Sequence, residues 1–501
     1  MTNGWHEVAG RCANYRWDQN FVISNETVVG DSCFDSNHAK LLLQPRVSLA
    51  WDPTGTGTWA VRAGFGIHND LIDNLGIRLQ PNPPTNAREQ FTFTRGDGLL
   101  SLYPLQRGIA LPPACQGGPN VPTGCSIYSP AGVDPSLRTP TVQQWSLTVQ
   151  REITRNMMVE VGYVGSESYH TNIAVNGNGA SPLVCQNAQG CVSGGTSAAG
   201  LPLPTAVVSQ GTLYMPGCPA GTNCLTLPGT PGYRPNRNVA AGVAWFGWGT
   251  GSYHALNVSL VKRATRGLTF RTNYSWGKVM DYNSAVLAPA GENEPAALIT
   301  SYVRSLNRGI AGFSLAHQFN ASYSYQLPFG KGQRFAGGAT GFMNQLVGGW
   351  QWNGILNWQG GFPFTPLVGS NPAGTGDSSQ SDVPNLNPNF HGPVVLGRPD
   401  RWFDPNAFLM PTPGTFGNVA RGSFRGPGLT TFDASLFKKF TVSEKLTAQF
   451  RAEMFNAFNH ANFSYPNEVV FNGSAYNPSA GVVTQTNGTS RQLQFALKLI
   501  F

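Results

Sequence analysis

The sequence predicts an all-β fold, an antiparallel transmembrane β-barrel with long extracellular loops. Three observations lead to it. Only 12% of the residues are Asp, Glu, Lys or Arg, about half the share of ordinary soluble domains. The chain contains no apolar run long enough for a membrane-spanning helix. Segments of alternating polarity recur instead, joined in turn by short and long connectors, which is typical of barrels that cross a bilayer with strands.

The strongest single segment is the C-terminal one, residues 491–501. Its polar residues alternate with an apolar set that shares one face, namely Leu493, Phe495, Leu497, Leu499 and Phe501. Soluble domains seldom end on an aromatic strand, because chain termini fray into water. The last strand of an outer-membrane barrel does so because it closes the barrel and faces lipid. We therefore predict a barrel-closing strand, with a terminal sandwich strand as the alternative.

The other strands pair as hairpins around short turns. The expected pairs are 46–51 with 59–67, 144–150 with 157–163, 256–260 with 268–276, 319–327 with 350–358, and 432–440 with 446–454. With the terminal strand they make about eleven strands. Long Pro- and Gly-rich connectors separate the hairpins. If Phe501 ends at the periplasm, every short turn is periplasmic and every long connector is extracellular. Residues 1–45 are then an extracellular loop or partial strand region, and residues 46–501 form the transmembrane barrel region, with no plug domain.

Large aromatic residues gather near the ends of the expected strands. The set comprises Trp51, Trp59, Tyr163, Trp276, Trp350, Trp358 and Phe501. Amphipathic rings favour the interface between membrane and water. We therefore expect them to form aromatic girdles.

The eight cysteines fall into consecutive neighbours, Cys12 with Cys33, Cys115 with Cys125, Cys185 with Cys191, and Cys218 with Cys224. Even numbers at short spacings predict local disulfides in an oxidising compartment. The pairing rests on proximity alone, since eight cysteines allow many connectivities. A zinc site is disfavoured because CxxC spacing and neighbouring histidines are missing. With external long connectors, all of these cysteines lie outside the cell.

The net charge and the sequence motifs argue against several classes of function. The net charge is +8. The cations are scattered singly, apart from pairs such as Lys262-Arg263 and Lys438-Lys439, rather than clustered on one element as nucleic-acid binding requires. We expect them to face solvent or anionic lipopolysaccharide and expect no nucleic-acid partner. No HExxH, nucleophile elbow or P-loop is present in the sequence. The sequence therefore predicts neither an enzyme nor a bound cofactor or metal.

Polar residues on the strand faces opposite the apolar sets are expected to line the lumen. The candidates are Gln144, Gln150, Glu160, Arg271, Asn273, Gln449, Arg451 and Glu453. Arg451 and Glu453 share one strand face and are expected to bind a plug or each other. The connector over residues 360–429 carries Trp402, Phe403, Asp404, Asn406 and Phe408, which we hypothesise to capture a glycan by aromatic stacking.

Several segments resemble the C-terminal barrel of TonB-dependent outer-membrane receptors, specifically the Oar-like branch. They are residues 139–151 followed by 159–165, 253–260 with 274–278, 325–330, 425–428 and 450–460. The resemblance implies a 22-stranded barrel occluded by a plug, with a TonB-contacting box ahead of it. About half of those strands are visible, and no segment resembles a plug, a TonB box or a signal sequence. The chain is therefore expected to be a C-terminal fragment of such a receptor.

The resemblance implies a place and partners as well. The bacterial outer membrane is the expected location, with outer-membrane lipid, lipopolysaccharide and the barrel-assembly machinery as contacts. The TonB complex would be reached only through a missing N-terminal part. The expected function is binding and import of an extracellular nutrient that the sequence does not identify. The alternatives are a non-transporting surface barrel or adhesin with disulfide-tied loops, and a secreted all-β binding protein.

Overall fold

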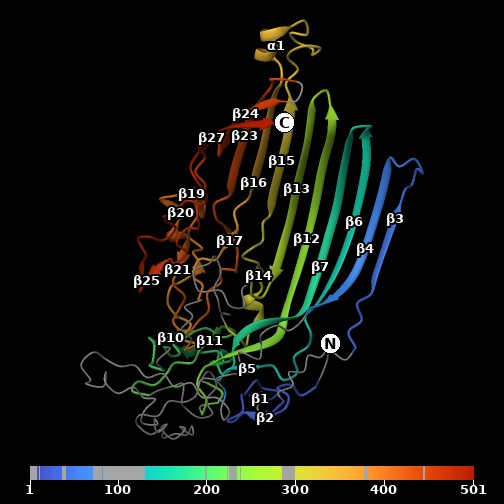
Figure 1. Cartoon of the computed structure of the whole chain (residues 1–501). Helices are drawn as coiled ribbons and strands as arrows, with labels where there is room; N and C mark the ends of the chain where they lie inside the picture. The colour runs from blue at the N-terminus through green and yellow to red at the C-terminus, as the bar shows by residue number, and fades with distance from the viewer. Residues whose placement is uncertain are drawn as a thin grey trace, which may run out of the picture.

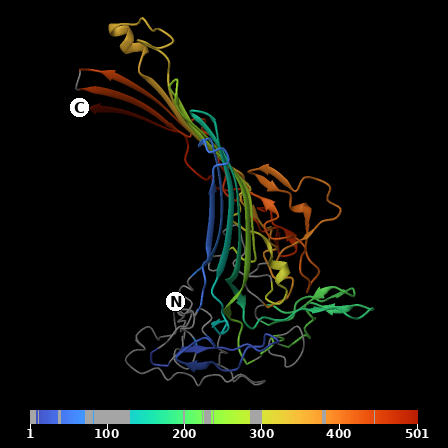
Figure 2. The same ribbon diagram turned by 90° about the vertical axis from the view of Figure 1, so that its right-hand side faces the viewer.

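A single curved antiparallel sheet organises the chain (Figures 1 and 2). The structure, a computed structural model, describes residues 8–10, 12–36, 41–70, 82, 130–197, 200–222, 224, 234–236, 238–284, 300–376, 382–443 and 446–501. Eleven long strands lie side by side in the order β27-β24-β23-β16-β15-β13-β12-β7-β6-β4-β3. Their bounds are β3 (Arg46–Trp51), β4 (Trp59–Asn69), β6 (Thr141–Thr154), β7 (Met157–Asn176), β12 (Val243–Thr265), β13 (Leu268–Asp281), β15 (His317–Gln326), β16 (Trp350–Gln359), β23 (Leu429–Thr441), β24 (Thr447–Phe455) and β27 (Gln492–Ile500).

The sheet is open. Within the described residues, β3 pairs with β4 alone and β27 pairs with β24 alone, so the two edge strands do not meet. Closure of a barrel by the terminal strand therefore stays a prediction. Every neighbouring pair along the order is antiparallel, so the expected hairpin pairing is confirmed.

The two faces of the sheet differ in chemistry because successive side chains alternate between them. One face is apolar; a typical row across adjacent strands is Val61, Val149, Val161, Val258, Tyr274, Phe319 and Trp358. Large residues of this face are exposed, among them Phe495 and Leu497, both at 68%. The aromatics expected at interfaces lie on the same face, at Trp51, Trp59, Tyr163, Trp276, Trp350 and Trp358, and Phe501 follows the last strand. The other face carries the polar side chains described below.

The two ends of the sheet also differ. Short turns between β3 and β4, β6 and β7, and β12 and β13 lie at one end, which we call the turn end (Figure 1). The long connectors gather at the opposite end, which we call the loop end. A short helix, α1 (Gly341–Val347), lies at the turn end between β15 and β16. The alternation of short and long connectors expected from the sequence is present.

The central strands β7 and β12 run past their neighbours at the loop end. The sequence predicted a long connector up to about residue 252, whereas β12 begins at Val243. The pairing of β7 with β12 shifts register between Phe246 and Thr250, which marks a bulge. A Cβ on Gly249 at this bulge would lie 2.1 Å from the hydroxyl oxygen of Thr171, so only glycine fits.

Short elements build the loop end. The N-terminal segment forms a two-stranded sheet, and other small pairs lie in the long connectors. Their bounds are β1 (Cys12–Asn14), β2 (Val28–Gly30), β5 (Gly132–Val133), β8 (Leu183–Val184), β9 (Cys191–Ser193), β10 (Ala206–Val208), β11 (Leu213–Tyr214), η5 (Arg304–Asn307), β14 (Gly309–Ile310), β17 (Pro363–Phe364), β18 (Asn385–Leu386), β19 (Val395–Arg398), β20 (Arg401–Phe403), η6 (Pro405–Ala407), β21 (Phe408–Leu409), β22 (Phe424–Arg425), β25 (Phe471–Asn472) and β26 (Ala475–Tyr476).

Disulfides join Cys12 to Cys33, Cys185 to Cys191, and Cys218 to Cys224. All three tie segments of the long connectors or of the N-terminal region. The expected pair of Cys115 and Cys125 lies outside the described residues.

Candidate functional site

A row of polar side chains crosses the middle of the sheet on the face opposite the apolar one. Register places directly opposite one another, on successive strands, Gln150, Glu160, Ser259, Asn273, Asn320, Asn357 and Thr431. The amide of Asn320 donates to Oδ1 of Asn357 at 2.8 Å, and Asn357 donates to the Thr431 hydroxyl at 3.3 Å. This polar row presents hydrogen-bonding groups on successive strands, as a face that lines a wet interior does.

All eight lumen candidates lie on this polar face. Gln150, Glu160 and Asn273 belong to the polar row itself. Arg271 lies toward the turn end and Gln144 toward the loop end of the same face. Gln449, Arg451 and Glu453 continue the face on β24. Their contact with a plug or a passing ligand stays a prediction.

Arg451, which was expected to bind a plug or Glu453, has other neighbours in the structure. Arg451 donates to Oε1 of Gln449 at 3.1 and 3.0 Å, and its guanidinium lies 4.8 Å from the ring centroid of Phe437. Within the described part of the chain no ion pair joins Arg451 to Glu453. On β6, Gln150 accepts from Arg62 at 2.6 Å and donates to Glu160.

A recess that the sequence did not predict lies at the loop end, a cavity of about 530 Å³ within the size range of small-molecule sites. Its wall is aromatic. Phe246 and Trp248, from the bulged end of β12, have ring centroids 4.2 Å apart. Phe21 lies 5.1 Å from Trp248 and 5.7 Å from Tyr302, and Trp17 packs edge-on against Phe246 at 5.1 Å. We call this the aromatic recess.

Two features of the chain hold this wall in place. Phe21 has a φ of +63°, which a bulky residue adopts only at a cost in strain. Packing of its ring among four other aromatic rings offsets that cost. Tyr302 donates its hydroxyl to the carbonyl of Gly179 at 2.8 Å, and burial raises the pKa of that phenol.

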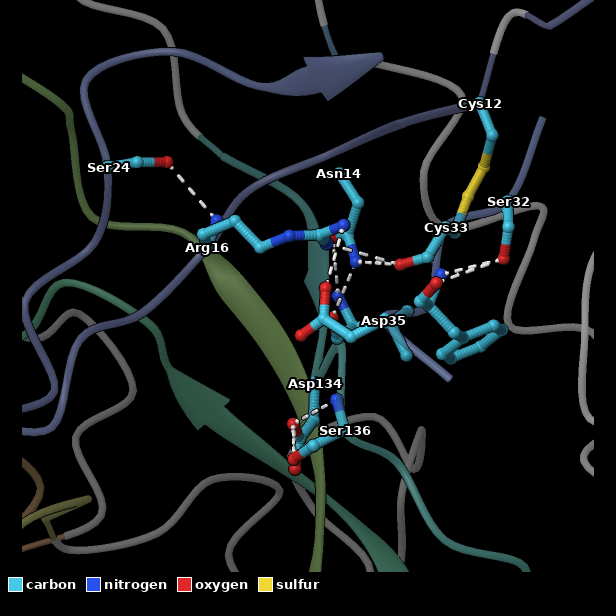
Figure 3. A network of polar contacts seen from close by, with 11 residues as sticks. Cys12, Asn14, Arg16, Ser24, Ser32, Cys33, Asp35, Asp134 and Ser136 are labelled. Atoms are coloured by element: carbon cyan, nitrogen blue, oxygen red, sulfur yellow. Dashed lines mark hydrogen bonds and ion pairs between the residues drawn. A yellow bond between two sulfur atoms is a disulfide. The ribbon is translucent and has the colours of Figure 1, made fainter. Parts of the chain in front are cut away.

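The rim of the recess is charged. Arg16 pairs with Asp35 at 3.1 Å and donates to the Cys33 carbonyl (Figure 3). Asp134, from the segment after β5, accepts from the backbone amide and hydroxyl of Ser136 at 2.9 and 2.7 Å. The exposed Arg304 also lines the recess, and its guanidinium lies 5.2 Å from the ring centroid of Trp248. A cation over an indole face is attracted by the ring, so this contact positions a positive charge at the recess.

Hydrogen bonds from two side chains of the N-terminal segment fix it to the sheet. Asn14 donates to the carbonyls of Cys33 and Val133 at 2.9 and 2.8 Å, and its Oδ1 accepts from the Val133 amide at 3.2 Å (Figure 3). The Trp17 indole donates to the Gly177 carbonyl at 2.8 Å. The region 1–45 was expected as an extracellular loop or partial strand region, and its described residues 16–35 supply one wall of the recess at the loop end.

The glycan-capture hypothesis for residues 402–408 is wrong for its two phenylalanines. Phe403 and Phe408 are fully buried and form the centre of a hydrophobic cluster with Phe364, so neither ring can stack on a sugar. Trp402 packs against this cluster and donates to the Arg425 carbonyl at 2.9 Å. Asp404 caps η6 by accepting from the Asn406 amide. The aromatic residues gather here because the long connector needs its own core.

Metal centres and helical membrane spans are the other features that bear on function. The described residues contain no cluster of three or more His, Cys, Asp or Glu side chains that is placed to hold a metal ion. The same part of the chain contains no helix that is long and apolar enough to span a membrane.

Comparison with known proteins places the chain in a family. The family model for the outer membrane beta barrel domain matches residues 1–494. The chain therefore belongs to that family and is a protein of the bacterial outer membrane, in contact with its lipid. No curated protein matches the chain.

Among solved structures, the outer membrane transporter YddB from Escherichia coli aligns with a TM-score of 0.41 and 10% identity, covering 97% of this chain and 42% of that one. The ferric enterobactin receptor PfeA from Pseudomonas aeruginosa has a TM-score of 0.37 and 10% identity, covering 91% and 40%. The FrpB iron transporter from Neisseria meningitidis has a TM-score of 0.35 and 11% identity, covering 91% and 39%. The chain spans about two fifths of these structures.

Proposed function

We propose that this chain is the barrel portion of a TonB-dependent, Oar-like outer-membrane receptor that binds an extracellular nutrient and lets it pass inward. The observation that carries the proposal is the combination of an aromatic, charged recess at the loop end with a continuous polar face along the strands. Long connectors of outer-membrane barrels face the medium, which puts the aromatic recess on the outside. The sequence resemblance to the receptor branch supports the same function.

The recess suggests the kind of nutrient. The rings of the recess pack against one another in tilted and edge-on contacts. Aromatic surface of this kind binds flat apolar faces, and the Arg304 guanidinium over Trp248 adds a positive charge. Arg16, Asp35 and Asp134 supply hydrogen bonds at the rim. We infer a ring-bearing ligand with polar or anionic substituents. The receptor acts without chemistry of its own, and the polar row then offers successive hydrogen-bonding groups to a ligand that has left the recess.

Several partners belong to the proposal. Insertion of the strands requires the barrel-assembly machinery. The two open edges of the sheet require further strands, because exposed backbone groups in lipid are costly. Energy from the TonB complex requires a plug and a TonB-contacting segment, neither of which is among the elements of the described residues.

Uptake tests this function even while the ligand is unidentified. Cells with the intact gene and cells with the gene deleted are grown in the same medium, and loss of solutes from the medium is followed by mass spectrometry. We expect at least one ring-bearing solute to be depleted only by cells with the gene, and only while the proton gradient is maintained. Identical depletion by both strains, or depletion that a protonophore does not slow, contradicts energised import. Surface attachment lost with the gene, without any change in uptake, would support the adhesin alternative.

A further inference from the structure

One connector at the turn end is unlike the others. Short turns join β3 to β4, β6 to β7 and β12 to β13, whereas residues 327–349 separate β15 from β16 and contain α1 (Figure 1). The connector is internally fixed, because the Lys331 amide donates to Oδ1 of Asn344 in α1 at 2.7 Å. We call residues 327–349 the β15–β16 connector.

The surface of this connector is apolar. On α1, Phe342 is 79% exposed, Met343 56% and Leu346 54%. Ahead of the helix, the rings of Phe329 and Phe335 lie 5.5 Å apart and are also exposed. Five large apolar side chains presented together are costly in water and mark a surface that is covered in the cell.

All charged side chains of the connector are positive. Residues 327–349 contain Lys331 and Arg334 and no Asp or Glu. Apolar residues combined with cations and no acids are typical of segments that lie in the interface of a membrane with anionic headgroups.

Hydrogen bonds fix the end of α1 over the apolar face of the sheet. The Lys438 ammonium donates to the carbonyls of Leu346, at 3.2 Å, and Gly348, and the Trp350 indole donates to the Leu346 carbonyl at 3.0 Å. Lys438 stands in register with Trp350, Phe450 and Leu497, which belong to the apolar face.

This arrangement explains how a lysine is tolerated on a face that meets lipid. Lys438 is 2% exposed, and the carbonyls at the C-terminal end of α1 accept hydrogen bonds from its ammonium group. The exposed surface of the connector is therefore continuous with the lipid-facing surface of the barrel.

We propose that the β15–β16 connector is an interfacial anchor, whose Phe342, Met343 and Leu346 insert among lipids of the periplasmic leaflet while Lys331 and Arg334 bind anionic phospholipid headgroups. The proposal commits to lipid rather than to a periplasmic protein because the connector is held over the apolar face and carries charges complementary to anionic headgroups. It uses the orientation in which the short turns are periplasmic. It does not depend on nutrient import.

The test places a fluorescent amino acid at position 342 of the full chain by stop-codon suppression, in vesicles whose lipids carry bromine on the acyl chains. One set of vesicles is phosphatidylcholine alone, and the other contains about one quarter phosphatidylglycerol. The same fluorophore at position 495, on the apolar face, checks insertion of the sheet. Position 207, an exposed site in β10 at the loop end, reports full exposure to water.

We expect bromine to quench position 342 as it quenches position 495. The quenching should be at least about twofold stronger with phosphatidylglycerol. The double variant K331Q/R334Q should lose that excess while position 495 stays quenched. The proposal is overturned if position 342 stays unquenched like position 207, or if its quenching is the same with and without phosphatidylglycerol. A protein adduct from a photo-crosslinking residue at position 342 in native membranes would also overturn it.

Discussion

The indole of Trp17 occupies the space beside Gly132, so that a Cβ on Gly132 would lie 2.1 Å from its Cη2 atom. The two residues come from segments far apart in the sequence. Gly132 belongs to β5, which pairs in parallel with the extended end of β12. Trp17 belongs to the N-terminal segment that walls the aromatic recess. The aromatic recess therefore depends on Gly132, because only the hydrogen atom of a glycine fits beside the Trp17 ring.

The variant G132A is expected to expel the Trp17 ring and loosen the N-terminal wall. Overpacking of this kind costs about 1–3 kcal/mol. Limited proteolysis within residues 12–36 should become faster, while the strands of the sheet remain protected. The matched control is G338A, because nothing lies within 4 Å of a Cβ at Gly338. Equal proteolysis of both variants would show that the Trp17 contact does not hold the wall.

Trp248 is expected to carry ligand affinity, because its ring lies beside Phe21 and Phe246 and under the Arg304 guanidinium. Loss of one stacking platform is worth about 1.4 kcal/mol, or about tenfold in affinity. W248A should therefore slow depletion of the imported solute about tenfold at low concentration. W276A removes an equally large, exposed ring from the apolar face and should leave uptake unchanged. If W248A imports as the native chain does, the recess is not the binding site.

Tyr302 supplies a pH test of the recess. Burial raises the pKa of its phenol above the ordinary value of 10.0. The neutral phenol thus contributes stability that is complete below pH 10.0 and is lost as pH rises through the folded-state pKa. A difference titration of absorbance near the phenolate band, native minus Y302F, should show one tyrosine that ionises well above its ordinary range. Ionisation of Tyr302 at the ordinary pKa would mean that the wall of the aromatic recess at Tyr302 is open to water.

The ion pair between Arg421 and Asp281 fixes the connector after β16 to the loop end of β13. Their side chains are 5% and 15% exposed, and Arg421 also donates to the carbonyls of Asn307 and Asp281 at 2.9 and 2.6 Å. D281A leaves a buried guanidinium without its counter-charge, at a cost of about 3–5 kcal/mol. Thermal or denaturant unfolding should show this loss.

The second change R421M should recover much of the stability lost in D281A, because it removes the uncompensated charge. If D281A unfolds like the native chain, the ion pair does not hold the connector in place.

Sequence periodicity predicted the strands well wherever one face is apolar and the other polar. The expected strand over residues 46–51 is β3, and the return strand begins at Trp59 as expected. The alternation of apolar and polar residues is lost in residues 243–251, where Trp and Phe stand between glycines. The extension of β12 was missed for that reason, and the bulge that turns Trp248 toward the recess lies in the same stretch.

The recess itself could not be predicted from local patterns. Its walls come from Trp17 and Phe21, from Phe246 and Trp248, and from Tyr302, which only tertiary packing brings together. The density of aromatic residues in residues 245–248 was the available signal. The same kind of signal led to a wrong prediction at Phe403 and Phe408, because composition does not distinguish a ring that binds a ligand from a ring that forms a connector's core.

Labelling of intact cells tests most directly whether the aromatic recess faces the medium and the short turns face the periplasm. Gln19→Cys places a thiol at the exposed rim of the recess, and Thr54→Cys places one in the turn between β3 and β4. A thiol reagent that does not cross the outer membrane should label position 19 in intact cells. It should label position 54 only after the membrane is permeabilised, with the unaltered chain as background. Labelling of position 54 but not position 19 in intact cells would contradict the account.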